Sequence, residues 1–270
     1  MTAERAGMRI LFFDIDGTLV DHPSGIWPIP ADVMCELERL HEAGDKLIIC
    51  SGRPYTMIED ELRLPIFDAY VACNGAQVMV GGQTIFLAHL DPDIAHKAAD
   101  LFEDLGCEYM LETAHDIYLE RRYKELHDFF ASFFPDGFFT HDFDRDEVLA
   151  RTMKLEAKVD ADNYERASAT IIESIGYAAN VDRHGTEHAL EVYSKHITKG
   201  EGVRQALAHF DASPEQAYAF GDGVNDIEMF RACGTSVAMG NADEELKRMA
   251  DVITDPVWEG GLATYLRTLG

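Results

Sequence analysis

The stretch FFDIDGT, residues 12–18, decides the fold. It completes an apolar run, MRILFF, that is too short for a helix and that predicts a buried parallel strand. Two aspartates, Asp14 and Asp16, stand where this strand ends, and Gly17 and Thr18 then turn the chain. The end of a hydrophobic strand is therefore expected to place the carboxylates of Asp14 and Asp16 together at one edge of a sheet.

The segments that follow extend this strand into a layered fold. Apolar residues at helical spacing, Val33, Leu37 and Leu40, predict a helix. Strand and helix then alternate, which predicts a Rossmann-like, doubly wound parallel sheet with helices on both faces. The expected elements are a helix at 30–44, a strand at 45–53, a helix at 54–64 that begins at Pro54, and a strand at 69–76.

The pattern changes near Gln83, where several strands alternate apolar and polar residues. Alternation suits an antiparallel sheet with helices on one face. We therefore expect an inserted α+β module over residues 83–186, with the first module made of residues 1–82 and 187–270.

The net charge and the cysteine content argue against several classes of function. The 270 residues carry a formal net charge of −26, which would repel nucleic acid and anionic membranes, so neither is an expected partner. The five cysteines are scattered without a CxxC pair, which argues against zinc and disulfide frameworks. The N-terminal residues lack the apolar run of a signal peptide, and a cytoplasmic protein is expected. The sequence does not fix the oligomeric state.

Polar residues follow each strand of the expected parallel sheet, and ligands bind at that edge of such folds. The second strand ends in Ser51-Gly52-Arg53, the third in Asn74-Gly75, and a later one in GDGVND with Asp222, Asn225 and Asp226. Lys199 opens the helix before that strand, where Thr198 and Glu201 predict a capping box; Lys195 is a rival.

This set of residues suits phosphoryl transfer. Several carboxylates packed together repel one another unless a hard cation such as Mg²⁺ joins them. A lysine at a helix N-terminus and a hydroxyl beside glycine can bind phosphoryl oxygens. Asp14 is then the expected nucleophile, and Asp16 the acid that protonates the leaving oxygen and the base that deprotonates water.

DIDGT, SGR, TKG and GDGVND, in that order, resemble the haloacid dehalogenase-like superfamily, and specifically the Cof-type phosphatases with an inserted α/β cap. The resemblance implies Mg²⁺ held by Asp14, the carbonyl of Asp16 and Asp222, with Asp226 orienting the metal's water. It also implies that the phosphate is held by Ile15 N–H, Ser51, Gly52, Lys199 and Asn225. Two departures are Gly223, where Asn is frequent, and His196, where Gly is frequent. The implied activity is hydrolysis of a small phosphorylated metabolite, such as a sugar phosphate, a cofactor phosphate or a nucleotide.

Other interpretations stay open at this stage. Asp14 and Asp16 alone could form a simple turn. A phosphomutase would share the same core, and a phosphate-binding regulator or a receiver-type phosphoacceptor would share part of it. Arg121, Arg122 and Lys124 form a basic cluster in an acidic chain, for which a solvated face is favoured over contact with an anionic substrate.

Overall fold

The computed structural model describes residues 7–131, 134, 137–159, 164–175, 179–180 and 188–270. The chain forms two compact units. Unit 1 consists of the residues up to Leu87 together with Ile197–Gly270, and unit 2 consists of Ala88–His196. Neither unit contains, within the described ranges, a helix long and apolar enough to cross a membrane.

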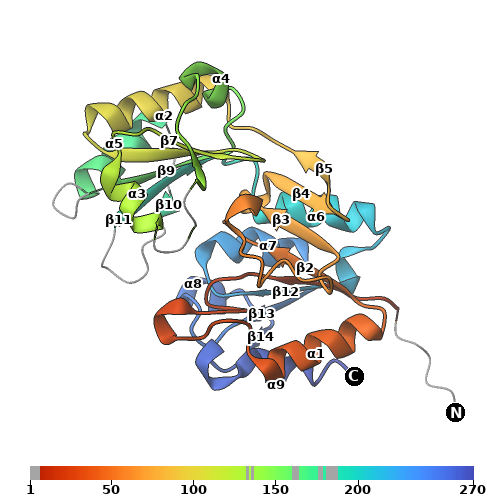
Figure 1. Cartoon of the computed structure of the whole chain (residues 1–270). Helices are drawn as coiled ribbons and strands as arrows, with labels where there is room; N and C mark the ends of the chain where they lie inside the picture. Colours follow the sequence, from red (N-terminus) through yellow and green to blue (C-terminus); the bar gives the residue numbers. More distant parts are fainter. Residues whose placement is uncertain (1–6, 132–133, 135–136, 160–163, 176–178, 181–187) are drawn as a thin grey trace, which may run out of the picture. The chain divides into compact units, whose positions relative to one another are not determined.

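Unit 1 is built on one sheet with the strand order β14-β13-β12-β1-β2-β3-β4-β5 (Figure 1). The strands from β14 to β3 are parallel, and β4 and β5 are added antiparallel at one edge. β1 lies in the middle and pairs with both β2 and β12, so its end is flanked by the ends of two other strands. The strands are β1 (Ile10–Phe13), β2 (Lys46–Cys50), β3 (Ala69–Ala72), β4 (Gln77–Val80), β5 (Gln83–Leu87), β12 (Ala217–Gly221), β13 (Thr235–Ala238) and β14 (Val252–Ile253).

Helices cover both faces of this sheet because successive side chains of β1 point to opposite sides. Leu11 and Phe13 belong to the apolar core that contains residues of α1 and α9, whereas Ile10 and Phe12 belong to the core that contains residues of α6 and α7. Figure 1 shows these two helix pairs on opposite faces of the sheet. The helices are α1 (Ala31–Glu42), α6 (Lys199–His209), α7 (Ile227–Ala232), α8 (Glu244–Lys247) and α9 (Gly261–Leu266).

Unit 2 has its own sheet with the order β10-β11-β9-β6-β7-β8. Its pairs are antiparallel except that β7 and β8 run parallel. Leu155 and Ala157 of β9 are buried, and Figure 1 shows α2 and α5 along the sheet. The elements are α2 (Pro92–Asp104), β6 (Glu108–Glu112), β7 (Ile117–Leu119), α3 (Lys124–Phe130), β8 (Phe139–Thr140), α4 (Arg145–Leu149), β9 (Lys154–Val159), α5 (Tyr164–Ile175), β10 (Ala179–Asn180) and β11 (His188–Tyr193).

The predicted fold class, a doubly wound parallel core with an additional α+β part, is confirmed. The two junctions lie elsewhere than expected. β5 pairs with β4, which keeps residues 83–87 in unit 1, and β11 pairs with β9, which keeps residues 188–193 in unit 2. The expected junction at 186 itself lies outside the described residues.

The predicted helix over 54–64 is wrong. Only Tyr55–Met57 form a short 3-10 turn after Pro54, and Ile58 returns to an extended backbone with φ −84° and ψ 118°. Ile58 and Leu62 are both buried in the core that α1 and α9 cover. These two residues are four apart, a spacing that a regular helix would bury as well, so apolar spacing alone does not fix the backbone here.

Candidate active site

The expected polar residues do converge at the carboxyl edge of the unit 1 sheet. Asp14 follows β1, Ser51 follows β2, and Asp222 follows β12. The parallel register places the ends of these neighbouring strands side by side, and the N–H of Asp14 donates to the carbonyl of Phe220 at 2.9 Å. The edge therefore gathers side chains from segments far apart in the sequence.

Lys199 lies at the centre of the site. Its Nζ contacts Asp14 Oδ1 and Asp226 Oδ1, each at 2.6 Å. Its side chain is fully buried, and both of its acidic partners are buried as well. Lys199, and not the exposed Lys195, is thus the lysine that the fold brings to the aspartates.

Thr198 precedes α6 as predicted, but the predicted capping box does not form. The Thr198 side chain makes no capping hydrogen bond. The Glu201 carboxylate instead accepts hydrogen bonds from Arg204 and Gln205 on its own helix. Lys199 still occupies the first helical position of α6. The start of this helix lies against Gly75, where a Cβ would stand 2.1 Å from the carbonyl oxygen of Thr198.

Burial and charge perturb the titration of this cluster. Burial raises the pKa of Asp14 from 3.8 to about 7; Lys199 opposes the rise, and Asp226 and Asp16 add to it. Burial lowers the pKa of Lys199, but Asp14 and Asp226 outweigh burial and raise its pKa well above the usual range. The cluster therefore holds more acid than its one lysine neutralises.

Asp226 uses both of its carboxylate oxygens within the protein. Oδ1 contacts Lys199, and Oδ2 accepts the backbone N–H groups of Asp222 and Gly223 at 3.0 and 2.9 Å. Asp226 therefore braces the loop after β12 and orients Lys199.

Asp222 lies against the turn that follows β1. A Cβ on Gly17 would stand 2.1 Å from Asp222 Oδ2, and Gly17 has φ +78°, so only glycine fits there. Asn241 donates to Asp222 Oδ2 at 3.2 Å and to the carbonyl of Gly17 at 2.9 Å. This contact holds the first and fourth motifs together.

Two of the expected phosphate-binding residues, Gly52 and Asn225, lie together with Asn74. Ser51 is buried, and a Cβ on Gly52 would stand 3.2 Å from Asn74 Oδ1 and 3.5 Å from Asn225 Nδ2. Asn225 Nδ2 donates to Asn74 Oδ1 at 3.3 Å, and within the described ranges the buried Asn225 Oδ1 has no hydrogen-bond partner. Buried polar atoms are normally paired, so this atom favours a ligand or water beside it. Ile15, whose N–H lies between the two aspartates, buries its side chain in the core.

Asp16 differs from Asp14 in its surroundings. Its side chain is 54% exposed and forms a bidentate ion pair with Arg53, at 2.9 Å from Nε and 2.6 Å from Nη2. Arg53 also contacts Glu59 at 2.6 Å. Desolvation raises the pKa of Asp16, but Arg53 outweighs it and the net pKa is lowered. The pKa of Asp14 is therefore raised, whereas the pKa of Asp16 is lowered.

The donor set fits a hard divalent cation. Asp14, Asp222 and Asp226 each offer a carboxylate oxygen, and these atoms lie within 4.8 Å of one another. Both carboxylate oxygens of Asp226 already accept hydrogen bonds within the protein. Asp14 and Asp222 are therefore better suited to bind the cation directly. Asp14 Oδ2 has no hydrogen-bond partner in the part of the chain that the structure describes.

The sequence predicts no role for Arg53 or for Asn241. Arg53 belongs to the SGR motif, but its ion pair with Asp16 depends on how the loops after β1 and β2 meet. Asn241 follows β13, another parallel strand that ends at the same edge. Its position shortly after a parallel strand is the feature of the sequence that points to Asn241 as a site residue.

The fold and the site together define an α/β enzyme whose aspartates and lysine meet at the carboxyl edge of a parallel sheet. A profile of haloacid dehalogenase-like hydrolases matches residues 11–266, so the chain belongs to that family. The resemblance drawn from the four motifs is thereby confirmed.

Individual relatives match over nearly the whole chain. "Putative phosphatase YkrA" of Bacillus subtilis is 28% identical, covering 97% of this chain and 98% of the relative. A phosphoglycolate phosphatase of Metallosphaera sedula is 27% identical, covering 91% of each chain. The solved structure of the sugar phosphatase BT4131, of haloacid dehalogenase subclass IIB, has a TM-score of 0.81 at 27% identity and covers 97% of this chain and 99% of that one.

Proposed function

We propose that the protein is a magnesium-dependent phosphatase that hydrolyses a small phosphorylated metabolite through an aspartyl-phosphate on Asp14. The observation that carries the proposal is the buried Asp14 at the end of β1, held 2.6 Å from Lys199 in a cluster with an excess of acid. Family membership and the phosphatase names of the full-length relatives support it.

Asp14 is the nucleophile in this proposal. Its carboxylate attacks phosphorus, and the ester oxygen leaves with the electron pair of the P–O bond. Asp14 Oδ1 is held by Lys199 and Oδ2 is available, so the attacking oxygen is oriented before the substrate arrives.

Asp16 is the general acid and the general base in this proposal. It gives a proton to the leaving oxygen and then takes one from the water that hydrolyses the phosphoaspartate. The ion pair with Arg53 lowers the pKa of Asp16, which favours the base form needed in the second step. We expect this pair to loosen when Asp16 acts as the acid.

The remaining residues hold the phosphate and the metal. Lys199, Ser51, Asn225 and the N–H groups of Ile15 and Gly52 would donate to the phosphoryl oxygens. Asp14, the carbonyl of Asp16 and Asp222 would hold Mg²⁺, with Asp226 orienting its water, in keeping with the magnesium preference for oxygen ligands. Bound Mg²⁺ would offset the repulsion between an anionic nucleophile and an anionic ester.

We assign recognition of the leaving group to unit 2, as a cap domain, because the residues of the unit 1 edge account for the phosphate and the metal alone. A sugar phosphate, a cofactor phosphate or a nucleotide would suit such an arrangement. A sugar phosphatase and a phosphoglycolate phosphatase stand among the relatives, which supports a small substrate.

The test is release of phosphate from an aryl phosphate with Mg²⁺ and with a chelator, followed by a panel of phosphorylated metabolites. Asp14→Asn should lose turnover. Asp60→Asn is the matched control, since Asp60 is an exposed acid of unit 1 outside the site. Phosphate release that persists in the chelator, or in Asp14→Asn, would overturn the proposal. Isomerised product without free phosphate would indicate a mutase instead.

A further inference from the structure

Two strand ends in unit 2 bring a group of basic side chains together. β7 and β8 are parallel neighbours, with Ile117 opposite Phe139, so the residues after each strand lie side by side. His141 Nδ1 donates to the carbonyl of Leu119 at 2.7 Å and ties the two ends together. Glu120–Arg122 from one end and His141–Arg145 from the other therefore form one surface.

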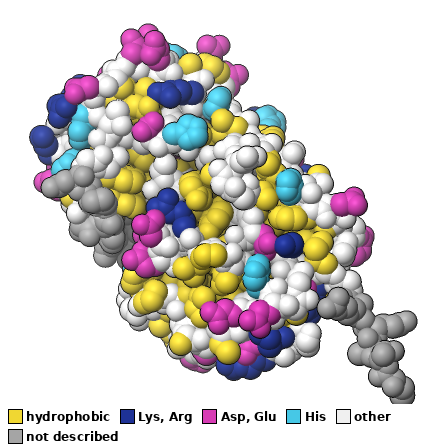
Figure 2. Space-filling model, turned by 45° about the vertical axis from the view of Figure 1, so that its right-hand side comes forward, with side chains coloured by type: hydrophobic (Ala, Val, Ile, Leu, Met, Phe, Trp, Pro, Cys, Tyr) yellow, Lys and Arg dark blue, Asp and Glu magenta, His cyan; other side chains and the backbone are white. Residues whose placement is uncertain are grey.

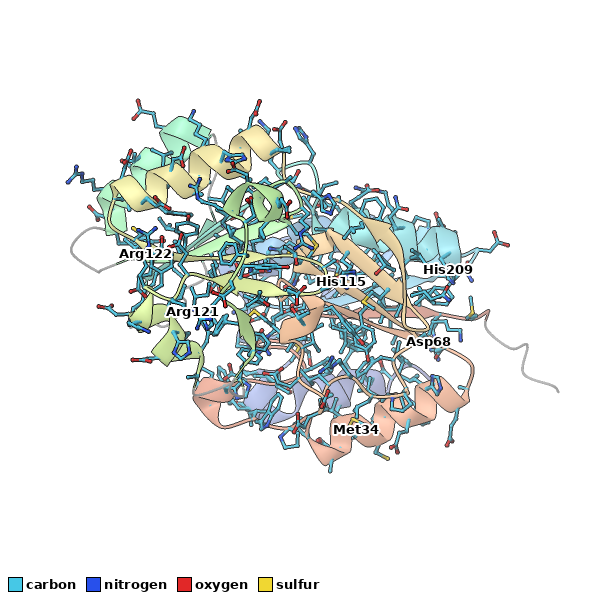
Figure 3. All side chains as sticks on the ribbon, turned by 45° about the horizontal axis from the view of Figure 1, so that its top comes forward. Met34, Asp68, His115, Arg121, Arg122 and His209 are labelled. Carbon is cyan, nitrogen blue, oxygen red and sulfur yellow. The ribbon has the colours of Figure 1, made fainter. Side chains whose placement is uncertain are left out.

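The basic groups converge around a hollow. Arg122 Nη2 and Arg145 Nε contact the same oxygen, Glu103 Oε1, at 3.2 and 3.7 Å. Figure 3 labels Arg121 and Arg122, which follow β7. The hollow measures about 320 Å³ and is lined by Glu120, Arg121, Arg122, His141, Phe143 and Arg145. We call it the arginine hollow.

Each of the three arginines keeps part of its guanidinium available. Arg121 contacts Asp142, Arg122 contacts Glu120 and Glu103, and Arg145 contacts Asp100, in every case through Nε or Nη2. None of the three Nη1 groups has a hydrogen-bond partner among the described residues. Because His141 uses Nδ1 as a donor, its Nε2 also remains for a ligand.

Four carboxylates contact these arginines and hold them in position. Asp142 is 86% exposed and Asp100 is 66% exposed, whereas Glu103 and Glu120 are 36% and 32% exposed. An anion that contacts the Nη1 groups leaves these pairs intact. The chain carries 49 acidic against 23 basic side chains, and Figure 2 shows acidic groups at many separate places, so three arginines around one hollow are unusual here.

We propose that the arginine hollow binds the phosphate group of a small molecule. A tetrahedral phosphate offers several oxygens at once, and arginine is suited to phosphate because its planar guanidinium donates in fixed directions. His141 Nε2 can accept a hydrogen bond from the P–OH group of a hydrogen phosphate. The volume accommodates a phosphate monoester, with Phe143 beside its organic part. The hollow is formed by residues of unit 2 alone, and the proposal does not depend on the proposed function.

The experiment is calorimetric titration of the full chain, in chelator, with inorganic phosphate and in a separate arm with glycerol phosphate. The test variants are Arg121→Gln, Arg122→Gln and both together. These side chains are 65% and 58% exposed, so the fold should tolerate the change. The matched control is the double variant Lys158→Gln and Arg166→Gln, which removes two charges from unit 2 outside the hollow. Thermal melting checks that every variant is folded.

Each single substitution should weaken phosphate binding about tenfold, the double variant more, and the control less than about twofold. Tighter binding of glycerol phosphate than of inorganic phosphate would identify the ligand as a phosphorylated metabolite, and equal binding would identify it as phosphate itself. An unchanged affinity in the folded double variant would place the bound phosphate elsewhere and overturn the proposal. Absence of measurable binding to the wild-type chain would overturn it as well.

Discussion

Asp14→Asn should make the metal-free protein more stable, and increasingly so as the pH rises. The folded-state pKa of Asp14 is raised, so the folded protein binds a proton more tightly than the unfolded chain does. Because the pKa of Asp14 is raised on folding, the free energy of unfolding of the wild type falls as the pH rises from about 4 to about 7. Asparagine does not titrate, so the free energy of unfolding of the variant does not fall for this reason.

The size of this stability difference follows from the raised pKa of Asp14. A rise from 3.8 to about 7 corresponds to roughly 4 kcal/mol at pH 8, at about 1.4 kcal/mol for each pH unit. The raised pKa already includes the opposing attraction of Lys199, so no separate subtraction is made for the loss of that partner. We therefore expect the stability gain of the variant to grow by on the order of 4 kcal/mol between pH 4 and pH 8.

The assay is urea unfolding in chelator at several pH values, followed by tryptophan fluorescence. Both tryptophans, Trp27 and Trp258, belong to unit 1, so the signal reports the unit that contains Asp14. Asp60→Asn, which removes an exposed acid outside the cluster, is the control and should not reproduce the growing stability gain between pH 4 and pH 8. Saturating Mg²⁺ should stabilise the wild type more than the variant. A stability difference that does not change with pH, or that falls as pH rises, would refute the reasoning about Asp14.

Three further outcomes follow from the proposed roles. Asp16→Asn should still form phosphoaspartate from substrates with good leaving groups but should hydrolyse it slowly, which intact mass of acid-quenched protein would reveal; equal loss of both steps would make Asp16 structural. Activity should require Mg²⁺ and be inhibited by Ca²⁺, which takes more ligands, and equal rates with the two ions in the phosphate-release assay would count against the site. Arg53→Met should raise the pKa of Asp16, so any limb of the pH–rate profile that reports Asp16 moves to higher pH, whereas Arg63→Met on the same unit should leave the profile in place.

Much of unit 1 could be predicted because the chemistry stands where strands end. A buried parallel strand is a continuous apolar run, and the residue after it lies at the ligand-binding edge. Asp14, Ser51 and Asp222 could therefore be placed together from local patterns alone. Lys199 could be placed because Thr198 precedes a helical pattern, even though Thr198 does not cap the helix through its side chain.

Other features depended on contacts that no local pattern specifies. Residues 83–87 show only a short alternating strand, and their place in unit 1 is decided by pairing with β4. Ile58 and Leu62 have an apolar spacing that is compatible with a helix, and both are buried, but on a backbone that is irregular after Met57. For residues 83–87 the deciding contacts are those between strands, which a local pattern does not specify.

The contrast between Asp14 and Asp16 is the clearest example of this limit. The two residues are chemically identical and nearly adjacent, so the sequence gives no reason for one to hold its proton and the other to release it. The difference arises because Ile15 packs into the core and draws Asp14 into a buried site, whereas Asp16 reaches Arg53 at the surface. The pKa of Asp14 is raised and that of Asp16 is lowered as a result. In the metal-free protein these shifts are the reverse of what the proposed roles need, because a nucleophile must be ionised and a general acid protonated. The proposed mechanism therefore requires that bound Mg²⁺ would lower the pKa of Asp14 and that a loosened ion pair with Arg53 would raise the pKa of Asp16.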